Sequence, residues 1–304
     1  MPAQSRALAR NSNLSAERLT GALLMAGAAV CFSTGGLFVR YLPALEPQQI
    51  VFWRSLFAGM FIFGVLARWH GRALPARVRA VGLPGVISAC FLAATFFFFI
   101  FSLSRTTVAN AAALMSTGPL FLAAAAWAFL GERPRTGTWL AIVAALAGTG
   151  LMFSEGFGGG QMVGNLLALA VPASFTVNYI VLRRAPAATD PTVAALLAAV
   201  FAAAIAAPLM WPPEITLRDF AVVAALGIIQ IGCGLVLMTR AYHRLSAGEL
   251  GLIGLAEPVL APLWVWLAIG ERPGAAALGG GLLVLAAVFL NQLLQFRAGA
   301  RANP

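Results

Sequence analysis

The sequence contains no lysine and only two histidines, and these absences exclude several classes of enzyme. A nucleotide-binding loop of the form GxxxxGK[ST] needs its lysine to hold the phosphates, so ATP hydrolysis by that route is excluded. A Schiff-base enzyme is excluded for the same reason. The two histidines, His70 and His243, lie too far apart for a zinc site of the HExxH type. The sequence therefore predicts neither an enzyme nor a bound metal or cofactor.

Charged side chains are also scarce. Only 10% of the 304 residues are charged and 61% are hydrophobic, whereas a soluble domain carries about 25% charged residues. Most of the molecular surface must therefore face lipid. The net charge of +10 includes 20 arginines that lie mainly between hydrophobic runs, where they contact lipid headgroups rather than nucleic acid. The three cysteines are scattered without metal-ligand spacing, so no disulfide is predicted.

Long hydrophobic runs make up most of the chain, and a membrane-spanning helix needs about 20 such residues. The first run is too long for the apolar region of a cleaved signal peptide, so it is predicted to remain as a span. The polar residues 1–18 before it are predicted to form a disordered cytoplasmic tail. Ten runs are found, at residues 19–40, 47–67, 80–103, 107–130, 137–154, 162–183, 191–211, 217–242, 249–269 and 275–296.

The distribution of arginine predicts the orientation of these spans. With a cytoplasmic N-terminus, 15 arginines fall on the cytoplasmic side and 4 on the other side, and Arg54 lies inside a span. Arginine is enriched in the cytoplasmic loops of membrane proteins. We therefore expect a multi-pass protein of a bacterial-type inner membrane, with the N-terminus and the C-terminal tail, residues 297–304, in the cytoplasm.

The second half of the chain repeats the first. A shift of 139 residues aligns the tetrapeptide Gly-Glu-Arg-Pro at residues 131–134 with the same tetrapeptide at residues 270–273. The same shift aligns Pro119 with Pro258, and a shift of 143 residues aligns Arg40 with Arg183 earlier in each half. Chance alone does not place this tetrapeptide, which we call the GERP motif, in register with the prolines.

Each repeat, at residues 19–154 and 162–296, holds five predicted spans. Because five is an odd number, the second repeat must enter the membrane upside down relative to the first. The predicted fold is an all-α integral membrane protein of ten transmembrane helices, built as two inverted five-helix repeats. Such repeats place a substrate site near the midplane of the membrane, and the two halves rock around it.

Three features of the sequence resemble a known family. They are the stretch from Glu257 through the second GERP motif, its weaker copy ending at Pro134, and Arg54 in the second span. They are similar to the EamA type of the drug/metabolite transporter superfamily, and the resemblance covers residues 20–296. It implies that the first four helices of each half line a central cavity and that the last pair packs the halves together. Members of the family include exporters of amino acids and related metabolites.

Two charged residues inside the predicted spans are candidates for the substrate site, because charge in hydrocarbon is costly and usually faces a partner or a water-filled cavity. Arg54 is expected to bind a substrate carboxylate or to pair with Glu257; alternatively it extends to the outer headgroups. Glu257 is expected to bind a substrate ammonium group or to carry a proton, since burial favours the neutral form of a carboxyl group. Alternatively it bonds backbone groups that Pro258 leaves free.

Four neutral polar residues lie in spans that the family uses for its cavity: Asn110, Asn178, Tyr179 and Gln230. Such groups orient small polar solutes, although they equally join one helix to another. Pro119 and Pro258 occupy equivalent mid-span positions, where proline breaks the helical hydrogen-bond ladder. We expect kinks there, which act either as hinges or as static bends.

These features predict a secondary transporter that exports amino acids or amino-acid-derived compounds by alternating access, driven by the substrate gradient or by proton exchange. A drug or nucleoside exporter, a vitamin importer and a lipid flippase are the open alternatives. An intramembrane protease is disfavoured because both aspartates, Asp190 and Asp219, lie in or beside loops. The expected partners are a small-molecule substrate and membrane lipid, with no nucleic acid, and the expected state is a monomer or weak homodimer.

Overall fold

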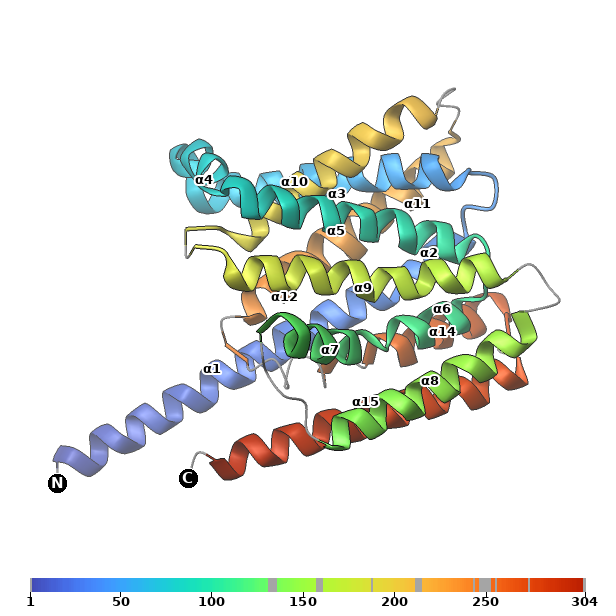
Figure 1. Cartoon of the computed structure of the whole chain (residues 1–304). Coiled ribbons are helices and arrows are strands. Elements are labelled where there is room, and N and C mark those ends of the chain that lie inside the picture. The colour runs from blue at the N-terminus through green and yellow to red at the C-terminus, as the bar shows by residue number, and fades with distance from the viewer. Residues whose placement is uncertain are drawn as a thin grey trace.

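The computed structural model is a bundle of helices whose N- and C-terminal ends lie at the same end of the bundle (Figure 1). It describes residues 2–130, 136–156, 161–186, 188–210, 215–242, 244–245, 253–254, 256–272 and 274–302, and the elements in these ranges are helical. The first half contains α1 (Pro2–Ser33), α2 (Gly35–Arg40), α3 (Pro47–His70), η1 (Gly71–Ala73), α4 (Leu74–Ala80), α5 (Gly82–Leu103), α6 (Val108–Met115), α7 (Gly118–Leu130) and α8 (Thr136–Gly156). The second half contains α9 (Met162–Arg184), α10 (Pro191–Ala206), η2 (Ala207–Leu209), α11 (Leu217–Ala225), η3 (Leu226–Cys233), α12 (Gly234–Tyr242), α14 (Ala256–Ile269) and α15 (Ala275–Ala302).

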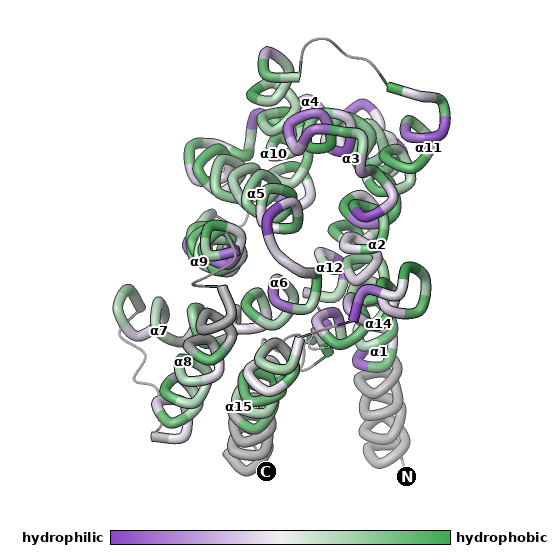
Figure 2. The backbone as a smooth tube through the Cα atoms, turned by 90° about the vertical axis from the view of Figure 1, so that its right-hand side faces the viewer, coloured by the Kyte–Doolittle hydropathy of each residue, from purple (hydrophilic) through white to green (hydrophobic). Residues whose placement is uncertain are grey.

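The helices follow the hydrophobic runs of the sequence. Lipid offers the backbone no hydrogen-bond partner, and a helix pairs its own backbone groups within one segment. Among the described residues, seven helices are long and apolar enough to cross a membrane, and three shorter apolar helices lie at Trp139–Gly148, Ala256–Ile269 and Leu278–Ala287. Hydrophobic residues also cover the outer helices (Figure 2), where Leu140 is 67% and Leu282 is 66% exposed, as expected of surface that faces lipid.

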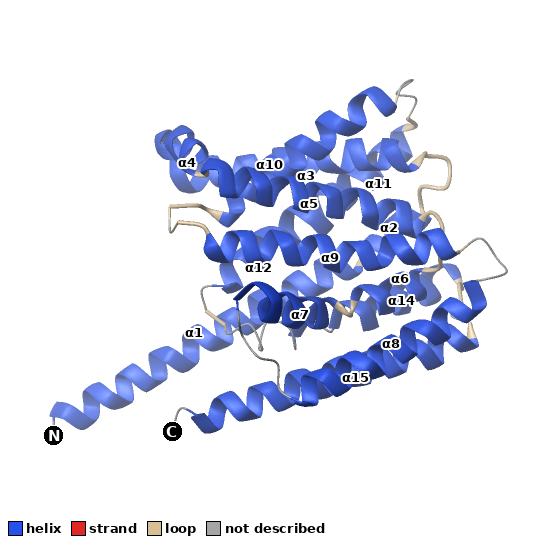
Figure 3. Ribbon diagram, in the orientation of Figure 1, coloured by secondary structure: helices blue, strands red, loops and turns tan. Residues whose placement is uncertain are grey.

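Several spans are divided rather than continuous (Figure 3). The predicted span at residues 107–130 contains α6 and α7, with Ser116 and Thr117 in a turn between them. Pro119 has no N–H group to donate to the carbonyl of Met115, so the helical ladder is interrupted there. The hydroxyls of Ser116 and Thr117 donate to the carbonyls of Ala113 and Leu114, each at 2.6 Å, which satisfies backbone groups at the break.

The N-terminal segment differs from its prediction. Residues 1–18 were expected to be a disordered tail, but helix α1 begins at Pro2 and continues into the first span without a break. Neither glycine nor proline occurs between Ala3 and Thr20, and a helix that is already nucleated in the span extends through alanine, leucine and arginine at little cost. The cytoplasmic location of this segment stays a prediction.

Contacts between the halves follow a two-fold pattern. The contact of α5 with α9 has its counterpart in the contact of α1 with α12, and the contact of α3 with η3 has its counterpart in that of α5 with α10. Three further contacts join a helix to its own equivalent: α3 with α10, α6 with α14, and α8 with α15. The repeat-related arginines Arg40 and Arg183 lie near opposite ends of the bundle, where α2 and α9 end (Figure 1).

Helices α8 and α15, together with Leu120 of α7, form a small core beside the main one. Its buried residues are Leu120, Ala141, Ala145, Val284 and Ala287. Gly148 allows the close approach, because a Cβ atom at this position would lie 2.7 Å from the carbonyl oxygen of Gly280. The last helix of each half therefore packs against its equivalent, as the family resemblance implied. The first GERP motif and Pro273 of the second lie outside the described residues.

Candidate functional site

A cavity of about 340 Å³ lies in the interior between the two halves. Helices α1, α2, α3, α5, α6, α7, α9, η3, α12 and α14 supply its described lining, whereas α10, the second span of the second half, supplies none of it. The polar side chains of the lining are those of Arg54, Thr95, Ser116, Thr176, Tyr179, Gln230 and Glu257. The remaining lining is aliphatic, aromatic or glycine, which is typical of a pocket for a small organic ligand.

Most of this lining comes from repeat-related positions. Eight pairs of lining residues are related by the two sequence shifts, so the cavity lies where the halves meet. The pairs are Phe32 and Phe175, Gly36 and Tyr179, Leu92 and Ile231, Phe96 and Leu235, Phe99 and Met238, Met115 and Gly254, Gly118 and Glu257, and Leu122 and Ala261.

Arg54 in α3 has no solvent exposure (0%) and is held by neutral groups. Its Nη1 donates to Oε1 of Gln230 at 3.2 Å, and its Nη2 donates to the carbonyl of Phe96 at 2.9 Å. The guanidinium also lies 5.3 Å from the ring centre of Phe96 and 5.5 Å from that of Phe99. Its Nε–H is buried and has no hydrogen-bond partner in the structure. The alternative of extension to the outer headgroups is wrong because the side chain is fully buried.

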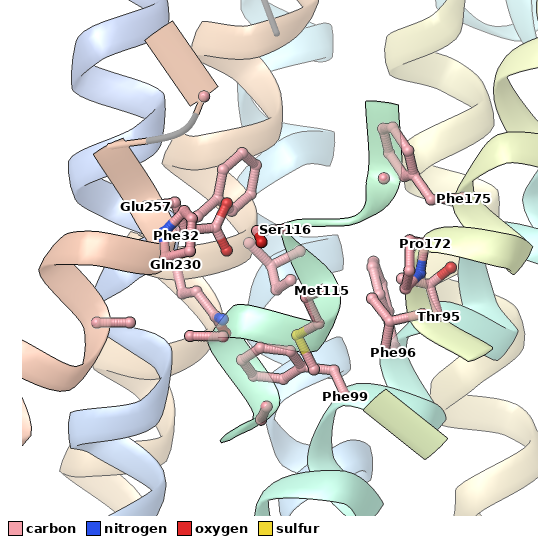
Figure 4. A pocket seen from close by; sticks show the side chains of 18 of the residues that line it. Phe32, Thr95, Phe96, Phe99, Met115, Ser116, Pro172, Phe175, Gln230 and Glu257 are labelled. Carbon is pink, nitrogen blue, oxygen red and sulfur yellow. The ribbon is translucent and has the colours of Figure 1, made fainter. Parts of the chain in front are cut away.

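Glu257 lies in the first turn of α14 and lines the same cavity. Figure 4 shows it beside Phe32 and Gln230, with Pro172, Phe175 and Thr95 across the cavity. Among the described residues the carboxylate takes part in no hydrogen bond or ion pair, and the predicted pair with Arg54 does not form. An acid and a base thus border one cavity without neutralising each other.

The glycine at position 35 makes room for the partner of Arg54. A Cβ atom there would lie 2.6 Å from Cδ of Gln230 and 2.8 Å from Cζ of Phe99. Gln230 itself belongs to η3, a stretch of π-helix that interrupts the α-helical geometry between α11 and α12. Such π-helical turns occur often at functional sites, because they reorient side chains along one face.

The structure corrects the placement of two predicted site residues. Asn178 is buried and its Oδ1 accepts a hydrogen bond from Ser88 at 2.6 Å, so it joins α9 to α5. Asn110 is buried near the start of α6, where its Nδ2 donates to Oε1 of Gln161 at 3.3 Å. Neither belongs to the cavity lining, whereas Tyr179 and Gln230 do.

Of the two predicted kink positions, one lies at this site. Pro258 lines the cavity, and Pro119 is the second residue of α7, directly after the break that follows α6. Whether either position moves stays a prediction. Phe32 and Phe175 were not recognised as cavity residues from the sequence, although their alignment by the repeat is a signal that points to a shared interface.

Comparisons with known proteins agree with this architecture. The chain is 31% identical over 280 residues to the pseudopaline exporter CntI of Pseudomonas aeruginosa, and the alignment covers 88% of this chain and 94% of that protein. It is 30% identical over 240 residues to the uncharacterized transporter YwfM of Bacillus subtilis, and this alignment covers 73% of this chain and 79% of that protein. A solved crystal structure matches with a TM-score of 0.65 and 23% identity over 91% of this chain and 98% of the other, which shows a shared fold. Residues 19–154 and 162–293 each match the EamA-like transporter family, and the chain therefore belongs to that family.

Proposed function

We propose that the chain is a secondary transporter with ten spans in two inverted five-helix repeats, located in the inner membrane with both termini in the cytoplasm. Among the described residues, the seven helices long enough to cross a membrane and the three shorter apolar helices support the count of ten. The two-fold pattern of helix contacts and the eight repeat-related pairs in the cavity support the inverted arrangement. Rocking of the halves around this cavity would expose it to each side of the membrane in turn.

The proposed cargo is an amino acid or an amino-acid-derived metabolite, moved outward. The observation that carries this proposal is that Arg54 and Glu257 line one cavity without an ion pair between them. A zwitterionic substrate offers a carboxylate to the free Nε–H of Arg54 and an ammonium group to Glu257, which stabilises both buried charges. Outward transport is proposed because the relative from Pseudomonas aeruginosa is an exporter.

Proton exchange is the proposed driving reaction, and the surroundings of Glu257 support it. Because this carboxyl group forms no hydrogen bond or ion pair with the described residues, it can gain or lose a proton without breaking such a contact. A proton and a substrate ammonium group would then compete for one carboxylate. Such competition couples two flows in opposite directions, since binding of one releases the other.

The substrate class is tested by counterflow in proteoliposomes with three matched probes. These are phenylalanine, its amide, which lacks the carboxylate, and phenylpropionate, which lacks the ammonium group. We expect exchange of phenylalanine and little exchange of either analogue, with empty liposomes as the control. If the amide exchanged as fast as phenylalanine, the proposed role of Arg54 would be contradicted. If phenylpropionate exchanged as fast as phenylalanine, the proposed role of Glu257 would be contradicted.

Metabolite profiling of the medium from overexpressing and deletion cells identifies the natural cargo. Accumulation of an amino-acid-derived compound in the medium of the overexpressing cells supports the proposal. Accumulation of a nucleoside or drug, depletion of a vitamin, or movement of lipid between leaflets without any soluble cargo would favour the corresponding alternative instead.

A further inference from the structure

An ion pair joins the two halves at the end of the bundle that lies away from the termini. Nε of Arg40 lies 2.7 Å from Oε2 of Glu271, and Nη2 of Arg40 donates to Oε1 of Glu271 at 3.2 Å. Arg40 is the last residue of α2 in the first half, and Glu271 belongs to the second GERP motif after α14. This two-point contact bridges residues that are 231 positions apart in the chain.

The same two side chains bind the backbone at one end of the cavity. Nη1 of Arg40 donates to the carbonyl of Leu103 at 2.9 Å, and the N–H group of Val108 donates to Oε1 of Glu271 at 3.3 Å. Leu103 and Val108 both line the cavity. Gly36 also lines it and lies against Val108, since a Cβ atom at position 36 would come within 2.6 Å of Cγ1 of Val108. The ion pair therefore holds wall residues of the cavity directly.

A polar network extends from the ion pair to the start of the second half. Nη2 of Arg40 donates to the carbonyl of Thr106 at 3.0 Å, and the hydroxyl of Thr106 donates to Oδ1 of Asn165 at 2.7 Å. Asn165 lies near the start of α9 and is fully buried. Four segments meet through these bonds: the end of α2, the α5–α6 connection, the start of α9 and the segment after α14.

We infer that this end of the cavity is a closed mouth and that the ion pair between Arg40 and Glu271 is its latch. The ion pair keeps the mouth shut and breaks once in each transport cycle. The inference rests on the proposed transport function, and in the proposed orientation this mouth faces outward. Each side chain of the pair is 26% exposed, so water solvates both charges when the latch opens and offsets much of the lost attraction. The contact between Nε2 of His70 and Oδ2 of Asp190, at 3.5 Å, joins residues that do not line the cavity.

The test measures access to the cavity and needs no known substrate. In a background with Cys31, Cys90 and Cys233 replaced by serine, Met115→Cys places one thiol in the cavity wall. A membrane-impermeant maleimide is applied to right-side-out and to inside-out vesicles, so both mouths are sampled. We expect Arg40→Gln and Glu271→Gln each to raise the labelling rate from the outer side at least several-fold, and to lower it from the inner side.

Arg272→Gln is the matched control, because Arg272 is exposed and adjoins Glu271 in the same segment. It should leave the labelling rate unchanged. Arg40→Lys retains the charge but loses the two-point contact, so the cavity thiol should be labelled at an intermediate rate. This variant also guards against a folding defect in the neutral variants. Folding is checked by size-exclusion elution. Unchanged labelling from both sides in folded Arg40→Gln, Arg40→Lys and Glu271→Gln would overturn the latch, whereas failure of the counterflow assay alone would overturn only the substrate class.

Discussion

Glu257 and Gly118 occupy equivalent positions in the two repeats and line the same cavity, so the carboxylate has no counterpart in the first half. Tyr179 and Gly36 form a second pair of this kind. In both pairs the polar side chain belongs to the second half and a glycine belongs to the first. The backbone frame is thus close to two-fold, whereas the polar side chains of the cavity are not related by that symmetry. A substrate with distinct ends would therefore keep one orientation while the halves rock around it.

Glu257→Gln removes the carboxylate that we expect to bind a substrate ammonium group. A hydrogen bond to a charged group contributes about 1.5–3 kcal/mol, so binding of an amino-acid substrate should weaken by about 10- to 100-fold. Radioligand binding to the purified protein measures the affinity, and transport under an imposed pH gradient measures the coupling. We expect the variant also to lose its response to the gradient.

The control for this variant is Glu17→Gln, which makes the same change at an exposed position of α1. It should bind and transport like the parent protein. Retained affinity together with an unchanged response to pH in Glu257→Gln would rule out both proposed roles of the carboxylate.

Gln230→Glu separates the structural role of Arg54 from its role in binding. The new carboxylate would accept from Nη1 of Arg54, as the amide oxygen does now at 3.2 Å, and it would neutralise the guanidinium. We expect thermal stability in detergent to be retained but affinity for a substrate carboxylate to fall about tenfold or more. Gln230→Ala instead leaves a buried donor without a partner and should destabilise the fold by about 1–3 kcal/mol. Equal affinity in the parent and in Gln230→Glu would show that Arg54 does not bind the substrate.

Gly35→Ala should disturb the site through sterics alone. The added methyl group would collide with Gln230 and with Phe99, whose Cζ would lie 2.8 Å away, and so displace the partner of Arg54. Overpacking of this kind costs about 1–3 kcal/mol, and we expect lower thermal stability and weaker substrate binding. Gly64→Ala is the matched control, because a Cβ atom there meets no atom within 4 Å. If both variants behaved alike, the close packing of Gly35 would have no functional consequence.

The positions of the helices and part of the site were predictable from the sequence for a physical reason. An apolar run in lipid must pair its own backbone, so its length alone indicates a span. Arg54 and Glu257 were found because charge in hydrocarbon needs a cavity or a partner. Which face of a helix borders the cavity was harder to predict. Tyr179 lines the cavity, but Asn178, one residue earlier, bonds Ser88 instead. Successive residues differ by about 100° around a helix, so neighbours in the sequence face different ways.

The contact between Arg40 and Glu271 could not be predicted from the sequence alone. The repeat marked both residues, since each has an equivalent in the other half, but it did not show which residues meet across the bundle. That contact depends on how the end of α2 meets the segment after α14, and packing between distant segments decides this. Asn110 was misplaced for the same reason, because its side chain bonds Gln161, whereas Val108 and Ala111 beside it in α6 line the cavity.

Gly148→Ala should weaken the contact between the last helices of the two halves without touching the cavity. Its Cβ atom would lie 2.7 Å from the carbonyl oxygen of Gly280 and 2.9 Å from Cγ2 of Val284, so α8 and α15 would have to move apart. We expect a loss of about 1–3 kcal/mol in stability, measured as a lower Tm in detergent, with substrate affinity unchanged. Gly279→Ala controls for the helical substitution, since its Cβ atom would meet Cδ2 of Leu151 at an ordinary 3.6 Å. A lower affinity in Gly148→Ala at temperatures where it remains folded would mean that α8 and α15 also shape the cavity, and the assignment of these two helices to packing alone would then be wrong.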